Sequence, residues 1–373
     1  MIKVLHIITG LGAGGAQNCL LQLIKHNHNK DIINGVISLG RGNLYNQEVS
    51  KITDYFKVIP INKNFSSIIN FLKINQEINN FNPDIVQSWL YHADLLTTLS
   101  IFLSRRKTKL IWNIRCSDMM GRYDKGINKL LLKTLSGLSF KPDVIISNSQ
   151  AGIDEHIKKG YKNDRMVKVS NGINTNTFKL THSKRKQIRD MLGIPNNILL
   201  AGNIGRYDIV KGHKIIIKAL SKSKDIWCLF VGEGITKAVE IQKLIKQYNL
   251  KNRVILLEQR NDIHEILSSL DIYISSSFSE GFPTAVAEAM SCQVPIISTK
   301  AGDSFEIVKE CGLFFKTGSS NDLFEKINRI KSMNLDEKEI LVQAARKRII
   351  DDFSIEKMVD KYHIIYRKLF NIS

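Results

Sequence analysis

Two glutamates eight residues apart form the most specific chemical feature of the 373-residue sequence. Glu280 follows a predicted strand at 272–275, and Glu288 lies nearly two turns into a helix that we expect to begin near Pro283, a residue suited to a first helical position. Carboxylates in a cleft without metal-ligand company are suited to accept hydrogen bonds from sugar hydroxyls. The free N–H groups at 281–284 can bind phosphate oxygens. A solvated surface position is the alternative for Glu288, but its helix is otherwise apolar.

Two cations follow another predicted strand, at 198–204. Arg206 and Lys211 lie five residues apart on a loop that leads into a helix at 212–222. A guanidinium fork together with an ammonium can bind a diphosphate. Both side chains could be ordinary solvated charges. Their position favours binding, because open α/β sheets bind ligands at the carboxyl ends of their strands.

A glycine loop from Gly10 to Gly15 directly follows the first predicted strand. It contains G-x-G-x-x-G, a spacing that lets backbone and a helix N-terminus approach a pyrophosphate. Dinucleotide-binding enzymes usually carry an acidic residue at the end of the second strand, whereas here that strand ends with Leu39, Gly40 and Arg41. Arg41 could bind a phosphorylated ribose, so an NADP-dependent oxidoreductase remains one alternative. A tight turn that only allows close packing of helix and strand is another.

Short apolar runs alternate with longer amphipathic stretches, and this rhythm occurs twice along the chain. Such alternation predicts two doubly wound α/β units with parallel sheets. Turn residues and a charged helix at 171–195 indicate the join, so we predict domains at 1–178 and 179–353. Two consecutive helices follow residue 334, and the last, at 354–373, has no strand after it.

The composition excludes several protein classes. Apolar residues make up 43% of the chain, which is typical of a globular protein rather than a disordered one. Five scattered cysteines and the lack of a long apolar stretch predict a cytoplasmic chain without disulfides or a membrane-spanning helix. The net charge of +19 predicts an anionic partner. No nucleic-acid-binding motif is present, so a nucleic-acid-binding α/β protein is an alternative that rests on charge alone.

The ordered set of motifs resembles family 4 glycosyltransferases over roughly residues 1 to 370. The matching segments are Gly14-Gly15-Ala16-Gln17, Ser147-Asn148-Ser149, Asn171-Gly172-Ile173, Arg206 with Lys211, Val231-Gly232-Glu233-Gly234, and Glu280 with Glu288. The resemblance implies the GT-B architecture, in which two Rossmann-like domains face a cleft and the C-terminal helix crosses back to the first domain. The expected reaction is the metal-independent transfer of a hexose or N-acetylhexosamine from a nucleotide sugar, with retention of configuration. UDP is the expected nucleotide, with GDP as an alternative, and no cofactor is expected.

The same resemblance implies roles for individual residues. Arg206 and Lys211 would neutralise the leaving diphosphate, and with Glu280 they form the expected catalytic set. Glu280 would bind the donor sugar, and Glu288 the ribose hydroxyls. The expected donor-binding residues are Gly14, Gly15, Arg206, Lys211, Glu280, Gly281, Phe282, Pro283, Thr284 and Glu288.

One departure from the family pattern concerns the segment after the strand at 109–114. Many family members carry a histidine where this chain has Arg115. Arg115 could contact a donor phosphate or an anionic acceptor, and Asp118 could assist the acceptor hydroxyl. His92, at the end of another predicted strand, is the nearest alternative imidazole, with local capping as its other interpretation.

The acceptor is expected to be a saccharide, and a lipid-linked one is our hypothesis. The stretch 122–138 combines an apolar stripe with Lys125, Lys129 and Lys133, which is typical of a helix at a membrane interface. A core-facing helix with a solvated basic edge is the alternative. Together with the positive charge, the stretch predicts peripheral contact with an anionic membrane at its inner face, as in O-antigen or other surface polysaccharide assembly.

Overall fold

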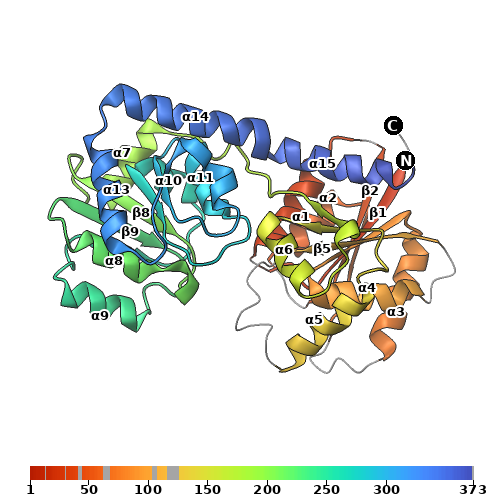
Figure 1. Ribbon diagram of the computed structural model, residues 1–373. Helices are drawn as coiled ribbons and strands as arrows, with labels where there is room; N and C mark the ends of the chain where they lie inside the picture. The colour runs from red at the N-terminus through yellow and green to blue at the C-terminus, as the bar shows by residue number, and fades with distance from the viewer. Residues whose placement is uncertain are drawn as a thin grey trace. The chain divides into compact units, whose positions relative to one another are not determined.

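The computed structural model describes residues 1–371 apart from 13, 30, 41–43, 62–67, 103–106 and 116–125, and it leaves the side chains of 68–70 undescribed. The chain divides into two compact units (Figure 1). Unit 1 contains Met1–Gly172 and Ile355–Ser373, and unit 2 contains Ile173–Ser354. The boundary lies after Gly172 rather than after residue 178 as the sequence predicts, and the last helix begins at Ile355 rather than at residue 354.

Unit 1 is built on a parallel sheet whose described strands follow the order β3-β2-β1-β4-β5-β6-β7. The strands are β1 (Ile2–Ile8), β2 (Ile32–Ser38), β3 (Tyr55–Val58), β4 (Ile85–Trp89), β5 (Lys109–Ile114), β6 (Val144–Ser147) and β7 (Met166–Lys168). The helices are α1 (Gly15–Lys25), α2 (Asn46–Ile52), α3 (Ile68–Phe81), α4 (Tyr91–Phe102), α5 (Gly126–Leu138), α6 (Gln150–Lys158) and α15 (Ile355–Lys368). The order reverses between β1 and β4, which pair in parallel with Ile8 opposite Trp89.

Unit 2 repeats this architecture with the strand order β10-β9-β8-β11-β12-β13. The strands are β8 (Leu199–Ile204), β9 (Ile226–Val231), β10 (Val254–Leu257), β11 (Ile272–Ser275), β12 (Ile296–Ser298) and β13 (Leu313–Phe314). The helices are α7 (His182–Met191), α8 (His213–Leu220), α9 (Val239–Gln247), α10 (Ile263–Ser269), α11 (Thr284–Ser291), α12 (Ser304–Val308), α13 (Ser320–Ser332) and α14 (Leu335–Phe353). Here the order reverses between β8 and β11. The two parallel-sheet α/β domains predicted from the sequence are therefore confirmed.

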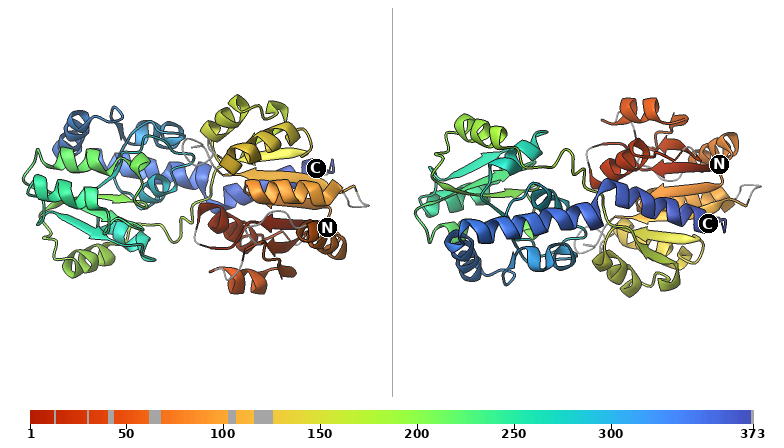
Figure 2. Two further views of the ribbon diagram at one scale, coloured as in Figure 1. Left: turned by 90° about the horizontal axis from the view of Figure 1, so that it is seen from below. Right: turned by 90° about the horizontal axis from the view of Figure 1, so that it is seen from above.

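The strands read as continuous apolar runs because helices cover both faces of each sheet. In β1, every side chain except Lys3 is buried. One face of the unit 1 sheet packs against α1 and α15, and the other packs against α3, α4 and α5. Figure 2 shows α15 lying over this sheet beside α1.

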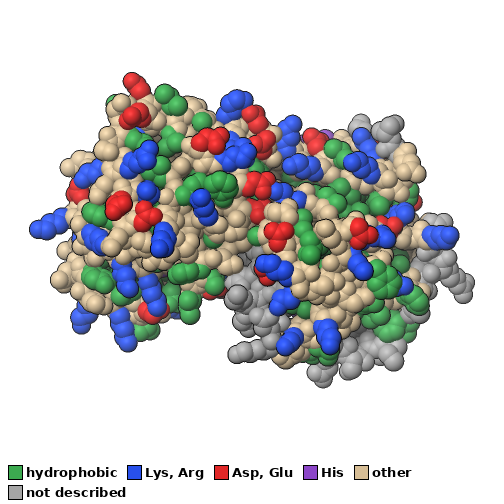
Figure 3. Space-filling model, viewed as in Figure 1, with side chains coloured by type: hydrophobic (Ala, Val, Ile, Leu, Met, Phe, Trp, Pro, Cys, Tyr) green, Lys and Arg blue, Asp and Glu red, His purple; other side chains and the backbone are tan. Residues whose placement is uncertain are grey.

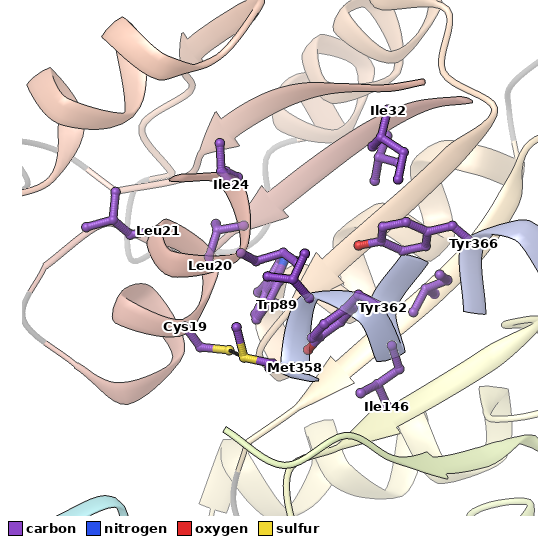
Figure 4. Packing of buried hydrophobic residues seen from close by; sticks show 14 of the residues in the cluster. Cys19, Leu20, Leu21, Ile24, Ile32, Trp89, Ile146, Met358, Tyr362 and Tyr366 are labelled. Carbon is purple, nitrogen blue, oxygen red and sulfur yellow. Dashed lines mark hydrogen bonds between the residues drawn. The ribbon is translucent and has the colours of Figure 1, made fainter. Parts of the chain in front are cut away.

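The last helix is attached to the rest of unit 1 by apolar packing (Figure 4) and also by polar contacts. The Tyr366 hydroxyl donates to Gln87 Oε1 on β4 at 2.5 Å, and Asn113 Nδ2 on β5 donates to the Tyr362 hydroxyl at 2.7 Å. All four side chains are buried. Buried polar groups are costly without partners, so these bonds fix α15 on the sheet. The expectation that the final helix returns to the first domain is confirmed.

Candidate functional site

The chemically important residues of unit 2 gather where its strand order reverses. β8 and β11 pair side by side although β9 and β10 separate them in sequence. Doubly wound sheets bind ligands at such a reversal, beyond the carboxyl ends of the strands. A cavity of about 290 Å³ opens there. Its walls include 203–205 at the end of β8, Tyr273 and Ser275 on β11, Lys211, Glu280, and the start of α11.

An ion pair joins two of the predicted residues inside this cavity. Lys211 Nζ lies 2.6 Å from Glu280 Oε1, and the Ser277 hydroxyl donates to the same oxygen at 2.6 Å. The side chains of Lys211 and Glu280 are 27% and 13% exposed. Both charges are therefore partly shielded from water yet open to a ligand that enters the cavity.

A glycine next to Lys211 allows the two loops to come this close. Gly212 has φ +67°, and a Cβ there would lie 2.2 Å from the carbonyl oxygen of Ser276. The Ser276 hydroxyl donates to the Lys211 carbonyl at 2.8 Å, and the Phe278 N–H donates to the Val210 carbonyl at 2.7 Å. The backbone, rather than the ion pair alone, thus determines where Lys211 and Glu280 meet.

The loop after β12 supports Glu280 from its other side. Gly302 has φ +55°, and a Cβ there would lie 2.1 Å from the Glu280 carbonyl oxygen. The Asp303 N–H donates to the Gly281 carbonyl at 3.0 Å, and the Thr299 hydroxyl donates to the Ser277 carbonyl at 2.6 Å. The Glu280 loop is therefore held by two neighbouring loops.

Glu288 lines the same cavity from α11. Its side chain is half-buried, and desolvation raises the pKa of its carboxyl to about 8. Burial is the main cause of the raised pKa of Tyr273, and the nearby carboxylates of Glu280 and Glu288 add to it. At neutral pH without ligand, Glu288 is mostly protonated, so it can donate a hydrogen bond as well as accept one.

The remaining residues predicted in unit 2 occupy different environments. Arg206 does not line the cavity: its side chain is 56% exposed, and Nη2 lies 3.1 Å from Asp208 Oδ2. Phe282 lines the cavity but is buried, with its ring 5.8 Å from that of Phe353, so it also packs against the core. Pro283 is the N-cap of α11, and the helix begins one residue later than predicted, at Thr284. Gly281 precedes this turn and accepts a bond from the β12 loop.

In unit 1, the predicted glycines lie at the start of α1 and His92 lies at the start of α4. Gly14 is the N-cap of α1 in an extended conformation, and a Cβ there would meet only the flexible side chain of Gln17. A Cβ on Gly15 would meet nothing within 4 Å. Neither glycine is required by local sterics, which leaves space next to the backbone at this helix end. His92 is half-buried, and burial lowers its pKa.

Arg115 is occupied by contacts within unit 1. Nε donates to Asn113 Oδ1 at 2.9 Å, and Nη1 donates to Asn171 Oδ1. Nη2 donates to the Tyr362 hydroxyl at 2.5 Å and to Cys19 Sγ at 3.0 Å. Four of its five N–H groups therefore have protein acceptors. This geometry makes Arg115 a link between β5, α1 and α15, and leaves little of it for a phosphate.

Two residues named in the sequence analysis, Asp118 and Arg41, lie outside the described part of the chain, as does the segment 122–125. Sequence reasoning also missed residues that the structure brings to the cavity: Asn203, Tyr273, Ser275 and Ser277. A signal exists for three of them, because Asn203, Ser275 and Ser277 lie at or just after the end of β8 or β11, whereas Tyr273 lies within β11. The carboxyl ends of strands at a reversal point are where polar side chains should be sought.

Comparison with known proteins identifies the family. Residues 13–177 match the family model described as Glycosyltransferase Family 4, and residues 184–348 match the one described as Glycosyl transferases group 1. The chain belongs to the family 4 glycosyltransferases. The match covers both units, and it gives no support to the oxidoreductase alternative drawn from the glycine loop.

Individual relatives agree with this assignment. The O-antigen biosynthesis glycosyltransferase WclY of Escherichia coli is 27% identical over 294 residues, which cover 77% of this chain and 80% of WclY. The crystal structure of Anabaena Alr3699/HepE in complex with UDP and glucose has a TM-score of 0.85 at 22% identity, covering 99% of this chain and 100% of HepE. A glycosyltransferase from Rickettsia africae has the same TM-score and identity, covering 100% of this chain and 99% of its own. These structures show that the chain has the GT-B fold.

The ion pair in the cavity generates a first prediction. Glu280→Gln should bind UDP about tenfold more tightly than the wild type, because the Glu280 carboxylate no longer competes with phosphate for Lys211 and charge-assisted bonds contribute about 1.5–3 kcal/mol. Isothermal titration calorimetry with UDP measures this. Glu265→Gln is the matched control, since Glu265 pairs with Lys184 at 2.9 Å away from the cavity. An unchanged or weaker affinity of Glu280→Gln for UDP would contradict the prediction.

A second prediction concerns stability and pH. The pKa of Glu288 is about 8 in the folded chain against 4.5 for a free carboxyl, so the folded state binds the extra proton between these values. Stability contributed by this group is therefore full below pH 4.5 and is lost as pH rises toward 8. We expect the melting temperature of Glu288→Gln, relative to the wild type, to rise steadily over this window. Glu325→Gln is the control, because Glu325 is exposed. If the melting temperatures of the wild type and Glu288→Gln change with pH in the same way, the raised pKa of Glu288 is wrong.

Proposed function

We propose that this glycosyltransferase moves a hexose or N-acetylhexosamine from a UDP-sugar to a saccharide acceptor, with retention of anomeric configuration. The observation that carries this proposal is the cavity of unit 2, where Lys211, Glu280 and Glu288 line one space at the reversal of the sheet. The HepE structures, whose complexes contain UDP, glucose or UDP-glucose, support a nucleotide-sugar donor.

Stabilisation of the leaving group is the proposed source of catalysis. As the bond between the anomeric carbon and the diphosphate oxygen breaks, the diphosphate takes the electron pair, the acceptor hydroxyl oxygen forms the new bond, and the hydroxyl proton passes to the departing diphosphate. Negative charge thus builds on the diphosphate next to Lys211, a cation fixed by its backbone and partly shielded from water. Arg206, on the same loop, would add a second cation once its guanidinium leaves Asp208.

The two carboxyl groups would orient the donor. When phosphate replaces Glu280 at Lys211, the Glu280 carboxylate becomes available to accept hydrogen bonds from sugar hydroxyls. Glu288, on α11, would bind the ribose hydroxyls. The backbone of 281–284 at the start of α11 would face the phosphates. In unit 1, Gly14 and Gly15 leave room for phosphate or acceptor to approach the start of α1.

We also propose that no metal ion or other cofactor is needed, because the cationic side chains supply the charge that a metal would otherwise bring to the diphosphate. Within the described residues, no three His, Cys, Asp or Glu side chains cluster as metal ligands. Activity that persists in excess EDTA would support this, and activity that returns only with added divalent cation would overturn it.

We propose a lipid-linked saccharide as the acceptor in the assembly of a surface polysaccharide. The supporting relatives are WclY and an N-acetylgalactosaminyltransferase of Campylobacter jejuni, whose name includes a diphospho-undecaprenol acceptor. The latter is 27% identical over 239 residues, 62% of each chain.

No described helix combines the length and apolar character needed to cross a bilayer. On the face seen in Figure 3, Lys and Arg are interspersed with acidic side chains rather than gathered in one stripe, which does not favour the nucleic-acid alternative.

The helix α5 is the proposed site of contact with an anionic membrane. Leu131, Leu132 and Leu135 are buried in the core, so the core-facing interpretation holds for one side of the helix. Ile127 and Leu130 are nevertheless 74% and 64% exposed. Exposed apolar side chains on a helix that also carries exposed Lys129 and Lys133 fit the interfacial interpretation.

The donor assignment is tested by nucleotide-sugar binding followed by turnover. A UDP-sugar should raise the melting temperature of the protein, with about 2.7 kcal/mol of added stability at one hundred times the dissociation constant. With that donor, Lys211→Ala should lower kcat about 10²- to 10³-fold, the usual loss for one group that stabilises developing charge. Lys214→Ala is the matched control, because Lys214 pairs with Glu240 at the surface. The proposal fails if no UDP-sugar stabilises the protein or if Lys211→Ala turns over normally.

Membrane contact is tested by co-sedimentation with vesicles. The protein should bind vesicles of phosphatidylglycerol and phosphatidylcholine at low salt, and binding should fall with added salt because part of it is electrostatic. Charge reversal in Lys129→Glu with Lys133→Glu should weaken binding, since each lysine near such a surface contributes about 1 kcal/mol. The control is the double variant Lys243→Glu with Lys246→Glu on α9. Equal binding of both double variants, or none by the wild type, would contradict this role of α5.

A further inference from the structure

Unit 1 contains a cavity of about 480 Å³ at its own sheet reversal, between β1 and β4. Thr9 lines it directly after β1, and His92 lines it in the helix that follows β4. This is the position at which doubly wound sheets bind ligands. The volume is well within the range of small-molecule sites, so the cavity is large enough for a specific ligand.

The chemistry of this cavity is the opposite of that in unit 2. Among the described lining residues there is no Lys, Arg, Asp or Glu, and the polar members are Thr9, His92 and Thr134. Burial lowers the pKa of His92, so its imidazole is neutral at pH 7. The other described lining residues are Leu or Ile. A diphosphate or a sugar would lose its hydrogen bonds to water here without replacement, whereas a hydrocarbon gains about 25 cal/mol for each Å² buried.

One wall of the cavity continues to the protein surface. Ile127, Leu130, Leu131 and Thr134 have the spacing of a single helical face on α5, and all four line the cavity. Leu131 is buried, whereas Ile127 and Leu130 are largely exposed. The apolar surface therefore runs from the interior to the mouth of the cavity. An occupant can lie partly inside and extend outward along α5.

We propose that this cavity binds the part of the acceptor's hydrocarbon chain that is attached to its diphosphate. The cavity would thereby select lipid-linked acceptors by their lipid. The inference rests on the proposed function, since it assigns the acceptor lipid to a place in unit 1. The size agrees with it. A cavity of about 150 Å³ holds one benzene molecule, and this cavity has about three times that volume. It can therefore take several five-carbon units of a chain, while the rest of a longer chain remains in the bilayer.

The test uses farnesyl diphosphate, a soluble fifteen-carbon chain on a diphosphate, with inorganic pyrophosphate as the chain-free comparison. Calorimetry in saturating UDP, which occupies the unit 2 cavity, should detect binding of farnesyl diphosphate to the wild-type protein and at least about tenfold weaker binding of pyrophosphate. Leu130→Asp, which puts a charge at the mouth, and Thr134→Trp, which fills the cavity, should each weaken farnesyl diphosphate binding about tenfold. Leu72→Asp is the matched control, because Leu72 is a 50% exposed leucine on α3 that does not line the cavity.

Two variants keep the test decisive if one of them does not fold. The inference is overturned if farnesyl diphosphate does not bind, if pyrophosphate binds as tightly, or if the folded cavity variants bind like Leu72→Asp. Stabilisation by UDP-sugars should be the same in all these variants, since the donor cavity lies in unit 2. Failure of the lipid site with normal UDP-sugar binding would thus leave the proposed donor chemistry intact. Failure of UDP-sugar binding with normal farnesyl diphosphate binding would contradict the proposed donor chemistry and leave the lipid site intact.

Discussion

The proposed chemistry of this protein depends on the ion pair between Lys211 and Glu280. Opposite charges at 2.6 Å inside a half-shielded cavity attract strongly, and each would be costly there without a partner. The pair exists because Gly212 permits one loop to pass against another without a side chain between them. In the proposed mechanism a diphosphate donor takes the place of Glu280 at Lys211. The Lys211 ammonium therefore has an anionic partner both before and after the donor binds.

The two units use one architectural rule for opposite chemistry. Each sheet reverses its strand order once, and each reversal opens a cavity at the carboxyl ends of the strands. In unit 2 the loops bring a cation, two carboxyl groups and a helix N-terminus to that position. In unit 1 the described walls are mostly aliphatic, with Thr9, His92 and Thr134 as the polar members. The fold supplies the position of a site, and the residues at the strand ends decide what the site can bind.

Much of the fold and part of the site could be predicted from the sequence. The repeated alternation of apolar strands and amphipathic helices predicts both sheets, and the spacing of Glu280 and Glu288 predicts two carboxyl groups near one helix start. Local pattern could not predict that Arg206 pairs with Asp208 outside the cavity wall, because that choice depends on the path of the loop. Nor could it predict the environment of Arg115, whose partners come from segments far apart in the chain.

The attachment of α15 has a consequence for how the chain folds as it leaves the ribosome. Domains usually fold in the order of their synthesis, with the N-terminal one first. Here the N-terminal sheet keeps Gln87, Asn113 and Arg115 without their tyrosine partners until the last helix has been made. Unit 2 is continuous in sequence and has no such requirement. The second domain can therefore finish folding before the first domain, which cannot do so until the C-terminal helix has been synthesised.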